Sequence, residues 1–290
     1  MTGQNRTRGQ LISVFDSAAN IKTIDNRLFV ITNNKVRSPI TINIIHDAGT
    51  RGFKKFMKFG SIIRGHRDQV MIDNNVTIGV SKSRLFENNL EYVTIRSLSK
   101  FRDKFDSIFP SMIKLARSGC LLSPDITTRG LLPEQIRVIK SNNKKTDDDA
   151  LFAAFMARTL GKLCGRGPGY TPAGDDFISG FLTMFNWCAK CLDFERIILP
   201  EEYSTMTSWT SYKLMEYSQE CICDEEIQGM VNSLALGRAD EYSKRMVPLS
   251  YRGHTSGVDL VTGMTCALYT LVDRKFGTSS LDKLNSSLRR

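Results

Sequence analysis

Short runs of apolar and β-branched residues, each bounded by Asn, Asp or Gly, mark the first third of the chain. They occupy residues 28–32, 40–45, 70–72, 76–80 and 92–95. Such runs are typical of strands, and 33–34 and 73–75 suit tight turns between them. The pattern predicts a small, largely antiparallel β barrel or sandwich over residues 1–97.

The apolar spacing changes to a helical period after residue 100. Phe105, Phe109 and Met112 recur at helical intervals, as do Phe152 and Met156. Segments 203–218 and 225–235 also predict helices, and 177–188 and 258–271 are apolar on nearly every face, as buried helices are. We therefore expect residues 98–290 to form one larger α-helical domain and the whole chain to be α+β.

A glycine-rich stretch precedes one of these buried helices. Residues 165–176 read GRGPGYTPAGDD, which predicts a turn, a cap at Thr171, and a helix that begins at Pro172. Backbone N–H groups at such a helix start bind phosphate or another anion. Asp175 and Asp176 would repel a bare anion, so they favour a bridging cation such as Mg²⁺, or a ligand amide. The alternative is a capped helix after a tight turn, with favourable first-turn charges.

A second stretch, RGHTSGVDLVTG at 252–263, repeats this pattern with one residue omitted. The matched pairs are Gly169 with Gly253, Thr171 with Thr255, Gly174 with Gly257 and Asp176 with Asp259. We predict that both stretches open helices and that their loops converge. A carboxylate in such a buried setting needs a partner, which is either a ligand or the backbone of the opposite loop.

Together the two stretches resemble the signatures of a bacterial family, formerly a domain of unknown function, that contains AllH, also called YlbF. The resemblance covers most of the chain, and its two motifs are specific. It implies a subunit of the multi-subunit oxamate carbamoyltransferase of anaerobic allantoin and purine degradation, which converts oxalurate and phosphate to oxamate and carbamoyl phosphate. Arg166 and Tyr170 depart from the small or aliphatic residues usual in the family, and either change would alter the ligand.

Carbamoyl transfer needs donors for the phosphate, a group that stabilises charge on the carbamoyl oxygen, and a group that orients the nitrogen. We assign catalytic roles to His254, Asp176 and Asp259, with His254 as the proton carrier of the motifs. The residues expected to bind substrate share the two loops: Arg166, Gly167, Gly169, Tyr170, Thr171, Gly174, Asp175, Gly253, Thr255, Ser256 and Gly257. Arg166 either clamps a phosphate or points into solvent.

The expected partners are the other subunits and a small anion such as oxalurate, oxamate, phosphate or carbamoyl phosphate. The net charge of +10 would draw in anions. The basic residues lack a groove-reading motif, so we expect no nucleic-acid partner. No apolar run is long enough to cross a bilayer. Residues 1–10 are polar and basic and lack the apolar stretch of a secretion signal. Together with seven cysteines, an odd number suited to reduced thiols, this predicts a cytoplasmic protein.

Other chemistries fit the sequence less well. Cys188 and Cys191 end a predicted helix, and Cys221 and Cys223 are separated by one residue, which argues against zinc. A hydrolase triad lacks its G-x-S-x-G elbow. No cofactor is therefore expected, with Mg²⁺ the one alternative.

Two alternatives to a catalytic subunit remain open. They are a non-catalytic assembly or regulatory subunit and an independent anion-binding protein.

Overall fold

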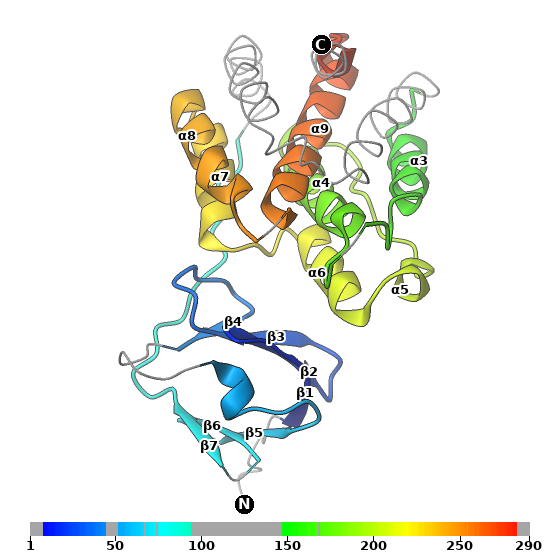
Figure 1. Ribbon diagram of the computed structural model, residues 1–290. Coiled ribbons are helices and arrows are strands. Elements are labelled where there is room, and N and C mark those ends of the chain that lie inside the picture. Colours follow the sequence, from blue (N-terminus) through cyan, green and yellow to red (C-terminus); the bar gives the residue numbers. More distant parts are fainter. Residues whose placement is uncertain are drawn as a thin grey trace, which may run out of the picture. The chain divides into compact units, whose positions relative to one another are not determined.

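The computed structural model describes residues 8–44, 52–66, 68–73, 75–93, 147–167, 169–253 and 255–282. The chain divides into two compact units, Met1–Asn88 and Asn89–Arg290 (Figure 1). The boundary expected after residue 97 lies outside the described residues and stays a prediction.

The N-terminal unit is a curled sheet. Its described strands are β1 (Arg8–Val14), β2 (Ala18–Thr23), β3 (Leu28–Thr32), β4 (Thr41–Asn43), β5 (Ile62–His66), β6 (Gln69–Ile72) and β7 (Val76–Gly79). They lie in the order β4-β3-β2-β1-β5-β6-β7. Only the β3–β4 pair among them is parallel. The expected small, largely antiparallel β unit is confirmed as a half-barrel.

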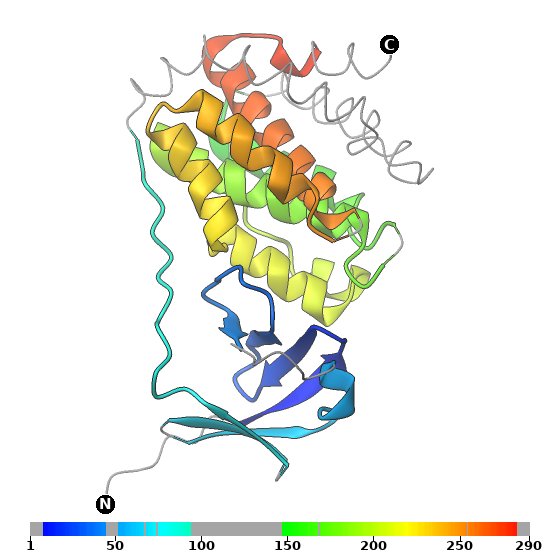
Figure 2. The ribbon, with the colours of Figure 1, turned by 60° about the vertical axis from the view of Figure 1, so that its left-hand side comes forward.

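A short 3₁₀ helix, η1 (Phe53–Lys55), lies inside the curl of the sheet (Figures 1 and 2). Phe53 and Met57 pack there against Leu11, Ile31 and Ile72 from three strands. The concave face of the sheet therefore has its own apolar core.

The strands predicted at 28–32, 40–45, 70–72 and 76–80 are found as β3, β4, β6 and β7. The strand predicted at 92–95 is wrong where it is described, because Tyr92 and Val93 belong to no strand. The backbone before them bonds to helix side chains instead. The Glu91 N–H donates to Asn232 Oδ1 (2.8 Å), and the Glu91 carbonyl accepts from Trp187 Nε1 (2.8 Å).

The second unit is helical. Its described helices are α3 (Asp149–Gly161), α4 (Ala173–Leu192), α5 (Tyr203–Met206), α6 (Trp209–Gln219), α7 (Glu225–Ala235), α8 (Ala239–Ser250) and α9 (Ser256–Phe276). The α+β prediction is therefore confirmed. The helix predicted over 105–115 lies outside the described residues.

One helix prediction is wrong in detail. The segment 203–218 forms two helices rather than one, because Thr207 is extended and Ser208 starts a new helix by accepting a hydrogen bond from the Ser211 N–H (3.1 Å). Thr207, at this break, forms a hydrogen bond with Asp175 of the first motif.

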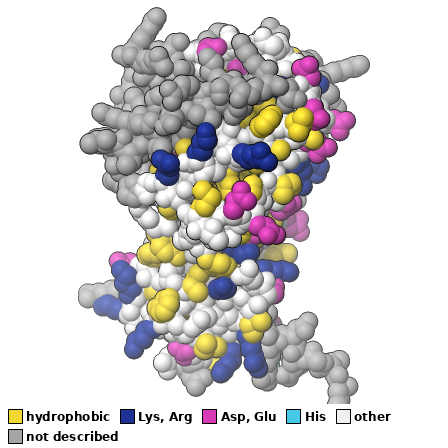
Figure 3. Space-filling view, turned by 90° about the vertical axis from the view of Figure 1, so that its right-hand side faces the viewer, with side chains coloured by type: hydrophobic (Ala, Val, Ile, Leu, Met, Phe, Trp, Pro, Cys, Tyr) yellow, Lys and Arg dark blue, Asp and Glu magenta, His cyan; other side chains and the backbone are white. Residues whose placement is uncertain are grey.

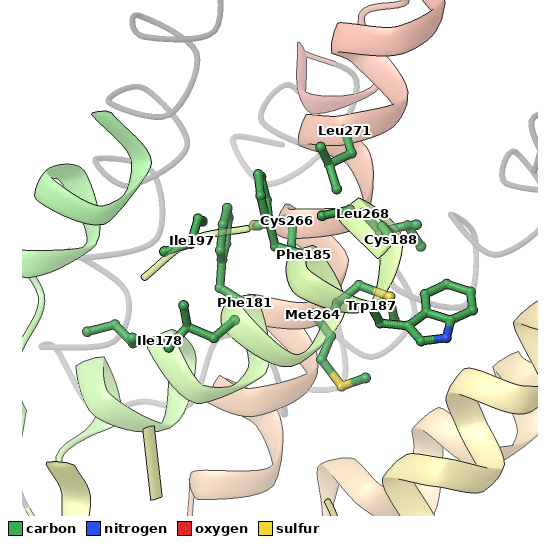
Figure 4. Packing of buried hydrophobic residues seen from close by; sticks show 14 of the residues in the cluster. Ile178, Phe181, Phe185, Trp187, Cys188, Ile197, Met264, Cys266, Leu268 and Leu271 are labelled. Carbon is green, nitrogen blue, oxygen red and sulfur yellow. The ribbon is translucent and has the colours of Figure 1, made fainter. Parts of the chain in front are cut away.

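Helices α4 and α9 form the centre of the helical unit. Their apolar side chains, among them Phe181, Phe185, Met264 and Leu268, belong to one buried core (Figure 4). Such complete burial explains why both segments are apolar on nearly every face.

Glycines let the two helix backbones touch. A Cβ atom on Gly180 would lie 1.9 Å from the Leu260 carbonyl oxygen, and one on Gly263 would lie 2.0 Å from the Phe177 carbonyl oxygen. Gly180 and Gly263 are equivalent in the sequence repeat, as are Phe177 and Leu260. The contact is therefore reciprocal, and the repeat is a pseudo-symmetric helix pair.

Candidate functional site

The first motif forms a tight loop before α4. The Arg166 N–H donates to the Leu163 carbonyl (3.0 Å), and the Gly174 N–H donates to the Arg166 carbonyl (2.8 Å). A Cβ atom on Gly174 would lie only 2.0 Å from the Leu163 carbonyl oxygen. Gly167 and Gly169 have φ angles of 107° and 109°, which side-chain-bearing residues rarely adopt.

The second motif repeats this construction before α9. The Arg252 N–H donates to the Leu249 carbonyl (3.1 Å), and the Gly257 N–H donates to the Arg252 carbonyl (2.9 Å). A Cβ atom on Gly257 would lie 2.1 Å from the Leu249 carbonyl oxygen. The two stretches thus share a backbone fold, which the sequence repeat predicted.

The two loops meet through three polar side chains. The Thr171 hydroxyl lies 3.4 Å from the Ser256 hydroxyl and donates to Asp176 Oδ2 (3.2 Å). The Ser256 side chain also forms a hydrogen bond with Asp176. Thr171, Asp176 and Ser256 are called the polar cluster below. The predicted convergence of the motifs is therefore observed.

The carboxyl group of the polar cluster has a perturbed pKa. Burial raises the pKa of Asp176 from 3.8 to about 7, and the hydrogen bonds from Ser256 and Thr171 oppose that rise. At neutral pH the group is present in both protonated and ionised forms. A carboxyl group with such a pKa is suited to both accepting and donating a proton near neutral pH.

The neighbouring Asp175 has a different environment. It is 2% exposed, and Oδ1 accepts the Gly165 N–H (2.7 Å) while Oδ2 accepts the Thr207 hydroxyl. Both carboxylate oxygens therefore hold the first loop against the break between α5 and α6. Thr207 was not predicted; the only signal for it is the Thr207-Ser208 pair, which can start a helix.

Arg252 fixes the second loop in a similar way. Its guanidinium group donates to both carboxylate oxygens of Asp224, at 2.5 and 3.1 Å, and to Glu226. Asp224 caps α7 by accepting the N–H groups of Glu226 and Ile227. These charges raise the pKa of Arg252 above its ordinary value, so it stays a cation that ties the loop to α7.

Comparison with known proteins places a family match on this part of the chain. Residues 163–268 match the family model described as oxamate carbamoyltransferase subunit AllH. The resemblance to AllH is confirmed over this segment. It contains both motif loops and the whole polar cluster, and its family name implies a subunit of oxamate carbamoyltransferase. No curated protein and no solved structure matches the chain.

Other predicted residues of the matched segment, 163–268, take varied positions. Tyr170 bridges the first loop to α6, where its hydroxyl lies 2.9 Å from Thr210 Oγ1. Arg166 is exposed, while Asp259 is buried in the first turn of α9. Gly253 has a φ of 64° and turns the chain toward α9. His254 lies outside the described residues, so its catalytic role stays a prediction, as does substrate binding by the loop residues.

The cap predicted for the first motif is wrong in its details. Pro172, not Thr171, is the N-cap of α4, and Thr255 is the N-cap of α9; neither side chain accepts a hydrogen bond from its helix. Thr171 instead directs its hydroxyl to Asp176 and Ser256. Thr171, which the local sequence places at the helix start, therefore forms a contact between the two motifs.

The six described cysteines are buried, and none of these six forms a disulfide. Burial raises the pKa of Cys164 and Cys266 to about 12, so both thiols stay protonated.

Over the described ranges, no group of three or more His, Cys, Asp or Glu is placed to hold a metal ion. In the same residues no helix is both long enough and apolar enough to span a bilayer.

Proposed function

We propose that this chain supplies part of the active site of a cytoplasmic oxamate carbamoyltransferase of allantoin degradation. The proposed reaction converts oxalurate and phosphate to oxamate and carbamoyl phosphate. A phosphate oxygen forms a bond to the carbamoyl carbon, and the bond from that carbon to the oxamate nitrogen breaks. The proton of the attacking phosphate hydroxyl is transferred to that nitrogen.

One observation carries this proposal. The polar cluster joins the two motifs inside the AllH segment and contains a carboxyl group with a pKa of about 7. Asp176 suits the proton transfer from phosphate to nitrogen, since an effective acid-base group has a pKa near the working pH. The hydroxyl groups of Thr171 and Ser256 would orient the substrate beside it.

The test uses the assembled enzyme. The chain is co-purified with the products of adjacent genes, and phosphate-dependent cleavage of oxalurate is measured. We expect Asp176→Asn to lower turnover by about 100-fold or more, a usual contribution of acid-base catalysis, while the complex stays intact. Asp193→Asn is the matched control, because Asp193 is exposed at the end of the same helix with a φ of 57° that Asn tolerates.

Two results contradict the proposal. One is oxalurate cleavage that is unchanged when this chain is omitted. The other is full turnover by the Asp176→Asn complex.

A second candidate is a non-catalytic subunit. Asp175 and Arg252 already use their charged groups to hold the fold, and the glycines at Gly180 and Gly263 allow close helix packing. Under this alternative, every variant that loses activity also loses assembly. Separate measurements of turnover and of complex size distinguish the two functions.

A further inference from the structure

The N-terminal unit contains a hollow that the polar cluster does not use. Its volume is ≈ 610 Å³, and its lining comes from β4, β7 and the segment around η1. The lining is mainly apolar and includes Ile42, Ile44, Phe53, Phe56, Ile78 and Val80. This hollow is called the β4–β7 groove below.

The strand at one side of the groove has an open edge. β7 is the last strand in the sheet order of the described residues. The Val80 N–H donates to the Asp68 carbonyl on the β6 side (2.7 Å). Backbone groups alternate in direction along an antiparallel strand, so those of Thr77 and Gly79 face the open edge. An open edge of this kind is a template for another strand.

Side chains alternate along the same strand. Val76 and Ile78 are half-buried and pack with the core of the sheet, whereas Thr77 and Gly79 are exposed. A strand added beside β7 would follow the same alternation. Every second side chain would point toward the groove and would need to be apolar.

The charge of this unit favours an acidic partner. Residues 1–88 contain 14 Lys and Arg against 6 Asp and Glu, so 8 of the 10 net positive charges lie there. Lys82 lines the groove, and Lys55 is exposed beside Phe56. Within the described part of the chain, neither lysine forms an ion pair. Figure 3 shows Lys and Arg interspersed with apolar side chains on one face of this unit.

We propose that the β4–β7 groove binds an extended, acidic segment of a partner protein, which pairs with β7 as an additional strand. Alternate apolar residues of that segment fill the groove, and its carboxylates face Lys55 and Lys82. Main-chain pairing provides affinity and the groove provides specificity. The mainly aliphatic lining favours a peptide over a nucleic acid, whose bases need aromatic stacking platforms. The inference does not depend on carbamoyl transfer.

The test is a fluorescence anisotropy titration of the full chain. The probe is a labelled peptide of about ten residues, a usual strand length, that alternates valine and glutamate. Thr77→Pro removes an edge N–H that no described strand uses, and proline is tolerated on edge strands. We expect this variant to keep its circular dichroism spectrum and to bind the peptide at least about tenfold more weakly.

Charge is tested separately. Lys82→Glu should also weaken binding by about tenfold or more. Lys22→Glu makes the same charge change at an exposed position of β2 away from the groove lining, and should stay within about twofold. A peptide that alternates valine and lysine should bind more weakly than the acidic peptide.

Several outcomes overturn the proposal. One is that the acidic peptide does not bind even at about 1 mM, a concentration that detects very weak affinity. Another is that a folded Thr77→Pro variant binds the peptide as tightly as the wild-type chain. A single-stranded oligonucleotide that binds more tightly than the peptide would identify a nucleic-acid surface instead. The unliganded chain could also form a dimer that Thr77→Pro abolishes. That result would show that the open edge of β7 pairs with a second copy of the chain instead.

Discussion

Gly180 packs against Leu260 with no space for a side chain between their helices. A Cβ atom at Gly180 would lie 1.9 Å from the Leu260 carbonyl oxygen and 2.7 Å from its carbonyl carbon. Both neighbours are backbone atoms inside a helix, so neither can move without shifting α9. The separation of α4 and α9, and with it the meeting of their loops, depends on this contact.

Gly180→Ala should therefore destabilise the helical unit severely. We expect a loss of more than about 3 kcal/mol, the upper range for overpacking, measured by urea unfolding with far-ultraviolet circular dichroism. Gly229→Ala is the matched control in α7, where the new Cβ atom would meet only the flexible end of Arg245. It should change the free energy of unfolding by less than about 1 kcal/mol. Equal stability of the two variants would contradict the close packing.

Asp175 should prove to be a structural residue. Asp175→Ala leaves the Gly165 N–H and the Thr207 hydroxyl without their acceptor and should cost about 2–4 kcal/mol. Asp175→Asn should cost less, because its amide oxygen can accept the N–H and its amide group can donate to Thr207. Urea unfolding measures both variants.

Thr207→Val completes a double-mutant cycle with Asp175→Ala. Its cost of about 1 kcal/mol in the wild-type chain should largely disappear in the Asp175→Ala background, since the shared contact is already lost. Full additivity of the two costs would show that these residues do not interact.

The stability of the chain should depend on the protonation of Asp176. Its pKa is raised by burial from 3.8 to about 7. The folded chain therefore holds a proton that the unfolded chain has already lost, and stability falls as the pH rises between these values. Asp176→Asn removes the titrating group. Its stability relative to wild type should increase by about 1–3 kcal/mol from pH 5 to pH 8, measured by denaturant unfolding at each pH.

Asp193→Asn serves again as the control and should show no such trend, because Asp193 is exposed. A pH-independent difference between Asp176→Asn and wild type would mean that the pKa of Asp176 is not raised.

Ser256→Ala should move the same titration. The hydrogen bond from Ser256 lowers the pKa of Asp176, so its removal should raise the pH at which the stability difference levels off. The free energy of unfolding of Ser256→Ala is compared with that of the double variant Ser256→Ala/Asp176→Asn at each pH. The pH dependence of this difference gives the midpoint of the Asp176 titration. An unchanged midpoint would contradict the contact between the two motifs.

Most of the helical unit and the pairing of its two motifs follow from the sequence. The repeat of Gly174 and Asp176 as Gly257 and Asp259 predicted two similar helix starts, and the buried helices that follow them predicted that the two loops converge. The apolar character of both helices predicted their burial. Alternating runs likewise predicted four of the strands, since the two-residue period of a strand appears directly in the sequence.

The tertiary structure decided what the two adjacent carboxylates do. Asp175 and Asp176 are adjacent in the sequence, but successive helical residues point in different directions. One meets Thr207 at an unexpected helix break, and the other meets Ser256 from the second motif. Likewise, residues 92 and 93 have strand-like composition but belong to no strand, because helix side chains bond to the backbone before them. Such partners lie far away along the chain, so only packing determines which groups become neighbours.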